Sequence, residues 1–411
     1  MANLPSSQAI IASGVASSRT DMTKRSLIVN ATAIGDCVDG IGVYGVHLVN
    51  ALWRAGVERP VTVVLNEDAR RFFPESSIPA DASVRWVSRR MSPSRGTTGN
   101  LQRWCFANQL AWRSRDALVF GLSQLEAPLV GSRGLVTIHD MIPWLFRDTH
   151  PRQYHFYRRC LGRALRRALA VITPSQATKN DVCRHYGIES DRVHVIHHGS
   201  PVPLSAGMDA DRPGAPYILW IGHVNPMKNL PALLAAFQMI EQQTDAHLVI
   251  AGEGSQVDVG ASGVDGRSLA RVTVLGPVSE ADKIALLDRA SVLVTPSLYE
   301  GFGFPALEAM ARGCPVVAAR TGALPEVCAD AALFVDPQRP EQIANAVLHV
   351  LRDPNVSRDL ADRGRARTRA FTWEASVRAH LAIVDRVARL DPHGKSGAAA
   401  GRRRIEVDVP Q

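Results

Sequence analysis

Strand-like and helix-like segments alternate along most of this chain, and the alternation runs twice. Between residues 26 and 200, short apolar runs are separated by segments with helical periodicity. After a break, the same alternation starts again at Tyr217 and continues to about residue 352. Short apolar runs separated by helices are typical of parallel sheets that carry helices on both faces. The predicted fold class is therefore α/β, with two doubly wound domains.

The expected elements follow from hydrophobic periodicity and from turn residues at the ends of each run. In the first half we expect strands at 27–33, 61–66, 83–88, 117–122, 135–140, 169–174 and 192–198, and helices at 42–55, 99–113, 152–168 and 175–185. In the second half we expect strands at 217–222, 247–252, 271–276, 291–296, 315–319 and 332–336, and helices at 229–240, 280–290, 304–312, 340–351, 356–370 and 373–390.

A proline-rich break divides the two halves. Four prolines lie between residues 200 and 216, where the apolar pattern is weak. This is typical of an interdomain linker. We therefore expect domains at 25–200 and 216–371, a linker at 201–215 and a separate last helix at 372–390. The Ser- and Ala-rich residues 1–24 and the Gly-, Ala- and Arg-rich residues 391–411 are expected to be disordered, and residues 1–24 do not resemble a signal peptide.

Composition limits the class of protein. No apolar run approaches the roughly 20 residues that cross a bilayer, and the six cysteines form no C-x-x-C pair, so we expect reduced thiols and no metal site. Fifteen of the arginines lie between Arg85 and Arg167, with no lysine and four acidic residues, whereas the whole chain has a net charge of +8. This surplus fits either a solvated basic face or contact with anionic lipid or a phosphorylated carrier. No nucleic-acid-binding motif accompanies it.

The segment from Glu300 to Glu308 has the strongest chemical signature. It follows an apolar strand, contains Gly301 and Gly303, and enters a helix at Pro305. Glycines let backbone N–H groups approach a ligand, and a helix N-terminus attracts phosphate. Ionised carboxylates accept hydrogen bonds from sugar hydroxyls. A pocket that offers both kinds of contact indicates a sugar nucleotide.

Three further loops follow predicted strands. Lys228 comes after the first strand of the second half, where its charge could neutralise a departing diphosphate; an ordinary exposed lysine is the alternative. His139 and Asp140 end a buried strand and could face the cleft between the domains, or could cap the next turn. The glycine turn at Gly40 and Gly42 opens a helix and could approach a ligand, or could serve tight turning alone.

His197 and His198 do not indicate a metal site. Adjacent residues of a strand face opposite ways, and no carboxylate partner is evident from the sequence. Glu253 follows a strand as well, and a turn residue and a ligand-binding residue are equally good interpretations.

At this point the chain resembles the retaining glycosyltransferases of family four, which have the GT-B fold. The resemblance covers 27–390 and is strongest from Pro296 to Ala311, continuing through Gly313-Cys314-Pro315 and Thr321–Val327. Gly40–Gly42, His139-Asp140 and Pro226–Asn229 resemble bacterial members that transfer mannose or related sugars. The resemblance implies two facing Rossmann-like domains, with the last helix crossing back to the first domain.

The resemblance also implies residue roles. Glu300, His139 and Lys228 would be catalytic: Glu300 would bind the donor sugar near the reacting carbon, His139 would touch that sugar, and Lys228 would stabilise the diphosphate. Donor binding would further use Gly42, Asp140, Gly222, Asn229, Gly301, Phe302, Gly303, Phe304 and Glu308, with Glu308 on the ribose. The family needs no bound metal ion and no cofactor. GDP-mannose is the donor that it favours here.

The resemblance implies a hexose transfer, with retention, to a lipid-linked or oligosaccharide acceptor in cell-surface polysaccharide, exopolysaccharide or O-antigen assembly. The enzyme would be cytoplasmic and peripherally bound to an anionic inner-membrane surface through the Arg-rich first domain, without nucleic acid. Two positions depart from the family, Met227 and His223, where members often carry arginine. These departures motivate one alternative, a non-catalytic partner subunit that keeps the fold. Another is a sugar-nucleotide epimerase on the same scaffold, because epimerases also use paired carboxylates. A two-lobed solute-binding protein is a weaker alternative.

Overall fold

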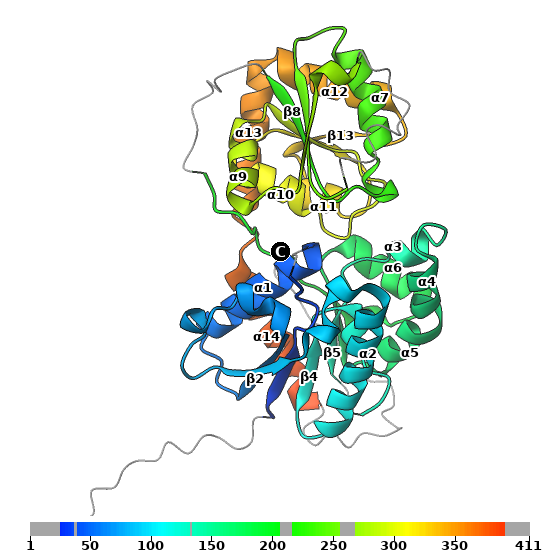
Figure 1. Ribbon diagram of the computed structural model, residues 1–411, viewed down its shortest axis with the longest axis vertical. Coiled ribbons are helices and arrows are strands. Elements are labelled where there is room, and N and C mark those ends of the chain that lie inside the picture. Colours follow the sequence, from blue (N-terminus) through cyan, green and yellow to red (C-terminus); the bar gives the residue numbers. More distant parts are fainter. Residues whose placement is uncertain (1–24, 37–38, 132–133, 206–215, 255–267, 391–411) are drawn as a thin grey trace, which may run out of the picture.

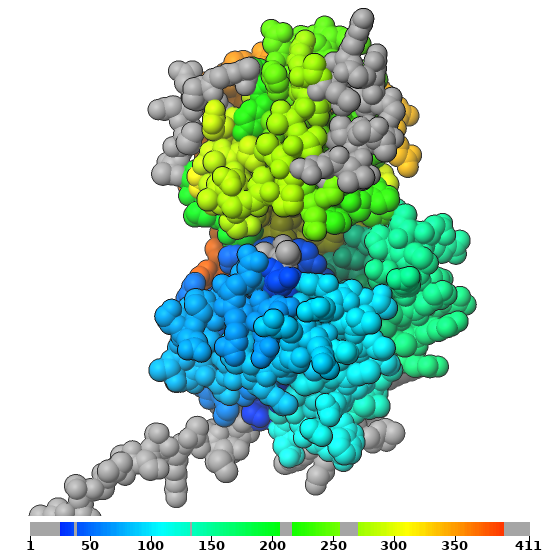
Figure 2. Space-filling view, in the orientation of Figure 1, coloured from blue at the N-terminus to red at the C-terminus, as the bar shows by residue number. Residues whose placement is uncertain are grey.

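The computed structural model describes residues 25–36, 39–131, 134–205, 216–254 and 268–390, which form two α/β domains stacked end to end (Figure 1). The expected disorder at 1–24 and 391–411 lies outside the described residues, as does most of the expected linker. The space-filling view shows the two domains meeting at a waist narrower than either domain (Figure 2). The fold class predicted from the alternation is confirmed.

The first domain contains a parallel sheet of seven strands in the order β3-β2-β1-β4-β5-β6-β7. Every pairing in it is parallel. The order reverses between β1 and β4, which is where doubly wound sheets bind ligands. The strands are β1 (Leu27–Asn30), β2 (Val61–Asn66), β3 (Ser83–Val87), β4 (Leu118–Gly121), β5 (Leu135–Thr137), β6 (Ala170–Thr173) and β7 (Val193–Val195).

Helices cover this sheet. They are α1 (Gly40–Arg54), α2 (Gly96–Arg113), α3 (Ile142–Leu145), α4 (Pro151–Phe156), α5 (Gly162–Arg167) and α6 (Gln176–Tyr186). Short 3₁₀ turns lie at Glu67–Arg71, Glu75–Ser77, Arg89–Met91, Pro93–Arg95, Gln124–Glu126 and Ser190–Arg192. The helix expected at 152–168 is not a single α-helix, because a π-helical turn at Tyr157–Leu161 separates α4 from α5.

The second domain has a parallel sheet of six strands in the order β10-β9-β8-β11-β12-β13. Its strands are β8 (Tyr217–Ile221), β9 (His247–Ala251), β10 (Val272–Gly276), β11 (Val292–Thr295), β12 (Val316–Ala319) and β13 (Ala332–Val335). Its helices are α7 (Leu230–Ile240), α9 (Glu280–Arg289), α10 (Phe304–Ala311), α11 (Leu324–Cys328), α12 (Pro340–Arg352) and α13 (Pro354–Thr368), with 3₁₀ turns at Pro226–Lys228 and Ser268–Arg271. The order reverses between β8 and β11, so the loops after these two strands are neighbours.

The last helix, α14 (Trp373–Leu390), packs on the first domain beside α1 (Figure 1). Nδ1 of His380 donates to the carbonyl of Ser376, so its Nε2 accepts from the hydroxyl of Tyr44 at 3.0 Å. An ion pair joins Arg59 to Asp385. Apolar residues of α14, among them Val377 and Val384, belong to the same buried cluster as the central strands of the first sheet. The expected crossing of the last helix back to the first domain is therefore present.

Candidate functional site

The loop between β11 and α10 is shaped by two glycines that have no room for a side chain. A Cβ on Gly301 would lie 2.1 Å from the carbonyl oxygen of His139, in the other domain. Gly303 has φ of 105°, and a Cβ there would lie 2.8 Å from the side chain of Leu324. Glycine is the residue that tolerates such a backbone conformation and such close packing. These contacts place the predicted donor loop directly against the first domain.

Glu300 and Lys228 form an ion pair within this loop region. The ammonium group of Lys228 donates to Oε1 of Glu300 at 2.7 Å, and the hydroxyl of Ser297 donates to the same oxygen at 2.7 Å. The side chain of Lys228 is 20% exposed and that of Glu300 is 11% exposed. Asn225 fixes the lysine's backbone by accepting from its N–H at the start of a 3₁₀ turn. Two residues predicted to be catalytic are therefore in direct contact at the edge of the cleft.

Glu308 lies in α10 and contacts a residue that the sequence did not single out. Its Oε1 accepts from the ammonium group of Lys283 at 2.8 Å, and the carboxylate is almost fully buried. Lys283 also contacts Glu280 at 2.8 Å. The sequence pattern that could have identified Lys283 is its spacing of four residues from Leu287, which places both on the buried face of α9. An expected ribose ligand is thus held by a lysine from a neighbouring helix.

His139 is buried rather than open to the cleft. Its Nε2–H donates to the carbonyl of Leu122 at 2.8 Å, and its ring lies edge-on to Tyr44, with 4.8 Å between the centroids. Burial lowers the pKa of His139 to about 4, so the ring is neutral near pH 7. The part of His139 that meets the donor loop is its backbone carbonyl, beside Gly301.

Asp140 is half-buried, and its Oδ1 accepts from the N–H of Ile142 at 2.9 Å. It therefore caps the following turn, which was the structural alternative for this pair. Burial raises the pKa of Asp140 to about 6, and the negative charge of Glu300 adds to this effect, whereas the hydrogen bond from Ile142 and the charge of Lys228 oppose it. Asp140 is thus electrically coupled to the ion pair of the other domain.

The glycine turn of the first domain faces Phe304. A Cβ on Gly40 would lie 3.7 Å from the Phe304 ring, at the start of α10. Gly42 is buried, and its N–H is bonded to the carboxylate of Asp39 at 2.8 Å. The approach of α1 to the donor loop is therefore made at Gly40, and the N–H of Gly42 is already used within its own turn.

Three other predicted donor-binding residues have structural contacts. Asn229 adopts a left-handed conformation, and its side-chain amide donates to the carbonyls of Pro296 and Pro337 at 3.1 and 2.7 Å. The N–H of Gly222 donates to the carbonyl of Ala251 at 3.0 Å. Phe302 is buried, with its ring centroid 4.8 Å from that of His198. These contacts position the loops around Lys228 and Glu300.

The two departures from the family pattern differ in position. The side chain of Met227 is 4% exposed and packs in the domain interior, and its carbonyl accepts from the N–H of Leu298. His223 is exposed, and its Nδ1 lies 3.5 Å from Oε2 of Glu253, which is also exposed. Of these two positions, only His223 is open to solvent at the edge of the site.

The N-terminus of α6 is bound by the second domain. The hydroxyl of Ser175 donates to the carbonyl of Gly301 at 2.8 Å. The carboxylate of Glu326 accepts from the N–H of Gln176 at 2.7 Å and from Nε2 of His197 at 2.8 Å. No carboxylate partner of His197 was evident from the sequence, because the partner comes from a distant part of the chain. Sequence reasoning also missed Ser175, which is the residue before the first helical position of α6.

The described residues contain no group of three or more His, Cys, Asp or Glu side chains arranged to hold a metal ion. Among the helices that the structure describes, none combines the length and the apolar character needed to cross a membrane.

Two family models match this chain. "Glycosyltransferase Family 4" covers residues 38–201, and "Glycosyl transferases group 1" covers residues 210–367. O-antigen chain mannosyltransferase B of Escherichia coli is 30% identical over 280 residues, which are 64% of this chain and 74% of the relative. O-antigen chain mannosyltransferase RfbU of Salmonella typhimurium is 26% identical over 80% of this chain and 92% of its own.

Solved structures share the fold at lower identity. Sucrose-phosphate synthase from Thermosynechococcus elongatus superimposes with a TM-score of 0.67 at 20% identity, covering 89% of this chain and all of its own. Anabaena HepE in complex with UDP and glucose gives a TM-score of 0.64 at 16% identity, covering 88% of this chain and all of its own. The two-domain architecture is therefore shared over nearly the whole described chain.

Proposed function

Because this chain belongs to the group 1 glycosyltransferases of family four, we propose that it transfers mannose from GDP-mannose to a glycan hydroxyl, with retention at the anomeric carbon. The choice of mannose is supported by the relatives, two of which are named O-antigen mannosyltransferases. The observation that carries the proposal is the contact between Lys228 and Glu300, at the edge where the two domains meet.

The chemistry assigned to this pair follows from charge. Cleavage of a sugar–phosphate bond leaves an anionic diphosphate and an electron-poor sugar ring. Lys228 can neutralise the diphosphate, and the free N–H groups at the start of α10 add a second favourable electrostatic contribution. Glu300 can accept hydrogen bonds from sugar hydroxyls. Donor binding would then replace the direct contact between Lys228 and Glu300 with contacts to the two halves of the donor.

The remaining residues define the surroundings of the reaction. Glu308, held by Lys283, is proposed to accept hydrogen bonds from the ribose. Asp140, with its pKa of about 6, is mostly ionised near neutral pH and lies within the electrostatic reach of Glu300, so it is a candidate acceptor for a hydroxyl proton. Contact of the two domains around Gly301 would exclude water and favour transfer over hydrolysis. We propose that neither a metal ion nor a cofactor takes part.

The acceptor is proposed to be lipid-linked or an oligosaccharide, in O-antigen or related cell-surface polysaccharide assembly. The basic surplus of the first domain supports association with the anionic inner surface of the cytoplasmic membrane. The protein would therefore work in the cytoplasm, at the membrane.

A product assay tests the proposal. The purified protein is incubated with radiolabelled GDP-mannose, and separately with UDP-glucose, with and without membrane extract as a source of acceptor. We expect radiolabel to appear in an acid-labile glycan only when both GDP-mannose and the acceptor are present. NMR of the product then assigns the anomeric configuration of the transferred sugar. Conversion of the sugar nucleotide to an isomer without acceptor would instead identify an epimerase. A non-catalytic subunit would show neither product, and a donor that binds to it would still raise its melting temperature.

A further inference from the structure

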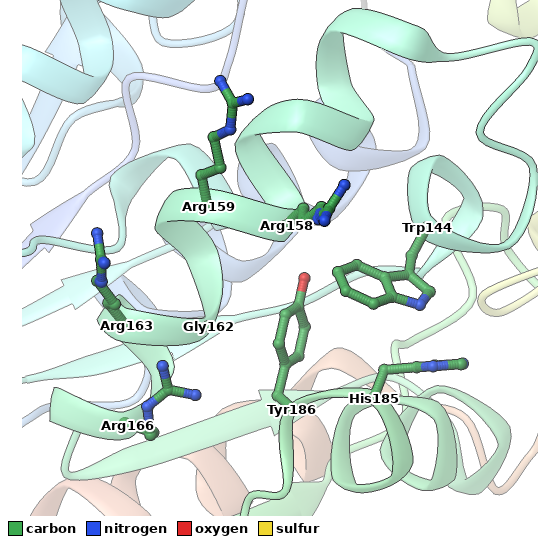
Figure 3. A pocket seen from close by; sticks show the side chains of 8 residues that line it. All are labelled: Trp144, Arg158, Arg159, Gly162, Arg163, Arg166, His185 and Tyr186. Carbon is green, nitrogen blue, oxygen red and sulfur yellow. The ribbon is translucent and has the colours of Figure 1, made fainter.

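A basic cavity lies on the outer flank of the first domain, away from the donor loop. Its volume is about 600 Å³, and it is lined by arginines from one helical segment and by aromatic side chains from α3 and α6, with Arg158 beside Trp144 (Figure 3). The lining residues used below are Arg158, Arg159, Arg163, Arg166, Trp144 and Tyr186. None of them belongs to the predicted donor site.

The four arginines come from consecutive turns of the segment formed by the π-helical turn and α5. Arg159, Arg163 and Arg166 are spaced four and three residues apart, so they are neighbours on one face of the helix. Arg158 lies next to this row, one helical turn before Gly162. Among the residues that the structure describes, no carboxylate lies within ion-pair distance of these four guanidinium groups, and no hydrogen bond uses their donors. Four uncompensated cations around one cavity create a strongly positive local potential.

The opposite wall is aromatic and fixed. The ring of Trp144 lies edge-on to Tyr186, with 5.3 Å between the centroids, and 5.5 Å from the ring of His185. The hydroxyl of Tyr186 donates to the carbonyl of Tyr157 at 3.0 Å. Gly162 lets this wall approach, because a Cβ there would lie 2.9 Å from the Tyr186 ring. The cavity therefore combines a rigid aromatic face with a flexible cationic rim.

This combination selects a class of ligand. Arginine binds phosphate oxygens through paired N–H donors, so several guanidinium groups favour a diphosphate over a single carboxylate. The exposed face of an indole ring suits an apolar or sugar-like group attached to that diphosphate. A metal ion is disfavoured by the same positive charge.

Helices α3 and α6 and the π-helical turn connect the cavity to the donor loop and to Asp140. Trp144 lies four residues after Asp140, and the hydroxyl of Tyr157 donates to the carbonyl of Asp140 at 3.5 Å. Helix α6 runs from Ser175, which contacts the donor loop, to His185 at the cavity. Ten residues of α-helix span roughly 15 Å. A ligand anchored in the cavity must therefore extend by about this length to reach the donor sugar.

We propose that this cavity binds the diphosphate of a carrier-linked acceptor and thereby holds the acceptor glycan at a set distance from the donor. The acceptor role of the bound molecule rests on the transferase function proposed above, whereas the binding of a diphosphate to this cavity does not depend on that function. The same phosphate chemistry is offered by a phospholipid headgroup, so the experiment has separate arms for the two sources.

The first arm measures anion binding without turnover. Inorganic pyrophosphate is titrated by calorimetry into full-length Lys228→Met protein, in which the donor site is weakened. The double variant Arg159→Ala/Arg163→Ala should lower the affinity about tenfold or more, because charge-assisted hydrogen bonds are lost. The matched control Arg113→Ala/Arg152→Ala removes the same charge from exposed positions of the same domain. An equal loss in both double variants, or no pyrophosphate binding in Lys228→Met, would overturn the proposal.

The second arm uses the transferase with Lys228 intact. The Arg159→Ala/Arg163→Ala pair should raise KM for a diphosphate-linked acceptor about tenfold, and should leave KM for a free oligosaccharide acceptor unchanged. The fraction of Arg159→Ala/Arg163→Ala protein that sediments with vesicles of phosphatidylcholine and phosphatidylglycerol should equal that of the Arg113→Ala/Arg152→Ala control. Loss of vesicle binding with both KM values unchanged would assign the cavity to a lipid headgroup and contradict the proposal. Unaltered circular dichroism establishes that each variant is folded.

Discussion

The ammonium group of Lys228 lies 2.7 Å from a carboxylate oxygen of Glu300, although the two residues are 72 positions apart. They meet because β8 and β11 are adjacent strands and each residue lies in the loop that follows its strand. The pair is only partly exposed, so each charge is stabilised by the other and by Ser297.

Replacing either member of this pair should abolish most of the transfer. We expect Lys228→Met and Glu300→Gln each to lower kcat/KM by about 10²-fold or more, as is common when a group that stabilises transition-state charge is removed. The double variant should lose less free energy of unfolding than the two single variants lose together, because neither charge is then left without its partner. Urea unfolding measures this difference. Glu341→Gln is the control, since Glu341 is exposed in the first turn of α12. Unchanged turnover in both single variants would refute the catalytic assignment.

Lys283 should matter for stability as well as for donor binding. In Lys283→Met the buried carboxylate of Glu308 loses its closest counter-charge, which should cost about 3 kcal/mol. The urea midpoint should fall, and KM for the donor should rise because Glu308 is no longer held in place. The exposed partner supplies the control: Glu280→Gln should change stability by less than about 1 kcal/mol. Equal midpoints for Lys283→Met and the unmodified protein would contradict this prediction.

Acid should destabilise the first domain. His139, His198 and His380 surround Tyr44, and burial lowers the pKa of His139 and of His380 to about 4 and that of His198 well below its usual value. Between pH 6.5 and 4 the unfolded chain therefore binds more protons, so stability falls as the pH decreases. The limit is on the order of 3 kcal/mol for His139 and for His380.

Asp140 opposes this trend, because its raised pKa of about 6 makes the folded state the better proton binder between about pH 4 and 6. Burial also raises the pKa of Glu126, which opposes the trend, and lowers the pKa of His47 and of His194, which adds to it. Two carboxyl groups against five histidines leave the net direction unchanged. Urea midpoints at about pH 7 and pH 4.5 test the sign. His380→Gln should flatten the dependence, whereas the exposed His223→Gln should not. A midpoint that rises on acidification would show that the histidines do not dominate.

Removing the carboxylate of Glu326 should loosen the contact between the domains. Glu326→Ala leaves the N–H of Gln176 and the ring of His197 without their partner, at a cost of about 1 kcal/mol for the lost hydrogen bonds. We expect a larger radius of gyration in small-angle X-ray scattering and more hydrolysis of the donor relative to transfer. Glu341→Ala, which removes an exposed carboxylate from the first turn of α12, is the control. An unchanged ratio of hydrolysis to transfer would argue against a role in closure.

Chelation should leave the activity intact. The diphosphate would be neutralised by Lys228 and by the N-terminus of α10, so transfer should continue after dialysis against EDTA. The assay compares initial rates before and after dialysis, and again after Mg²⁺ or Mn²⁺ is added back. A rate that collapses on chelation and recovers with one cation would refute the metal-independent mechanism.

The fold was predictable because buried parallel strands are short apolar runs with clear ends. The strand at Val61–Asn66 and the helix at Trp373–Leu390 were predicted with the observed bounds. The helices α3 and α11 have too few residues for periodicity to be measured. The π-helical turn was not foreseen, since it changes hydrogen bonding without interrupting the helical pattern of apolar residues.

Individual site residues were easier to find than their partners. Lys228 and Glu300 were identified from their positions after strands, but their mutual contact depends on strand order. Lys283 was missed because its importance comes from the burial of Glu308. His139 was expected to face the cleft, and its bond to Leu122 depends on the packing of β4 against β5, which no local pattern specifies.

The position of α14 has a consequence for synthesis of the protein. Trp373, Val377 and Val384 complete the interior of the first domain, where they join Tyr44 and Leu48. When the ribosome has synthesised the chain up to the linker, helix α14 has not yet been made. At roughly 5–20 residues per second, the nascent first domain waits on the order of ten seconds or longer with an apolar face uncovered. Truncation before α14 should thus yield an aggregation-prone fragment, even though the second domain would be nearly whole.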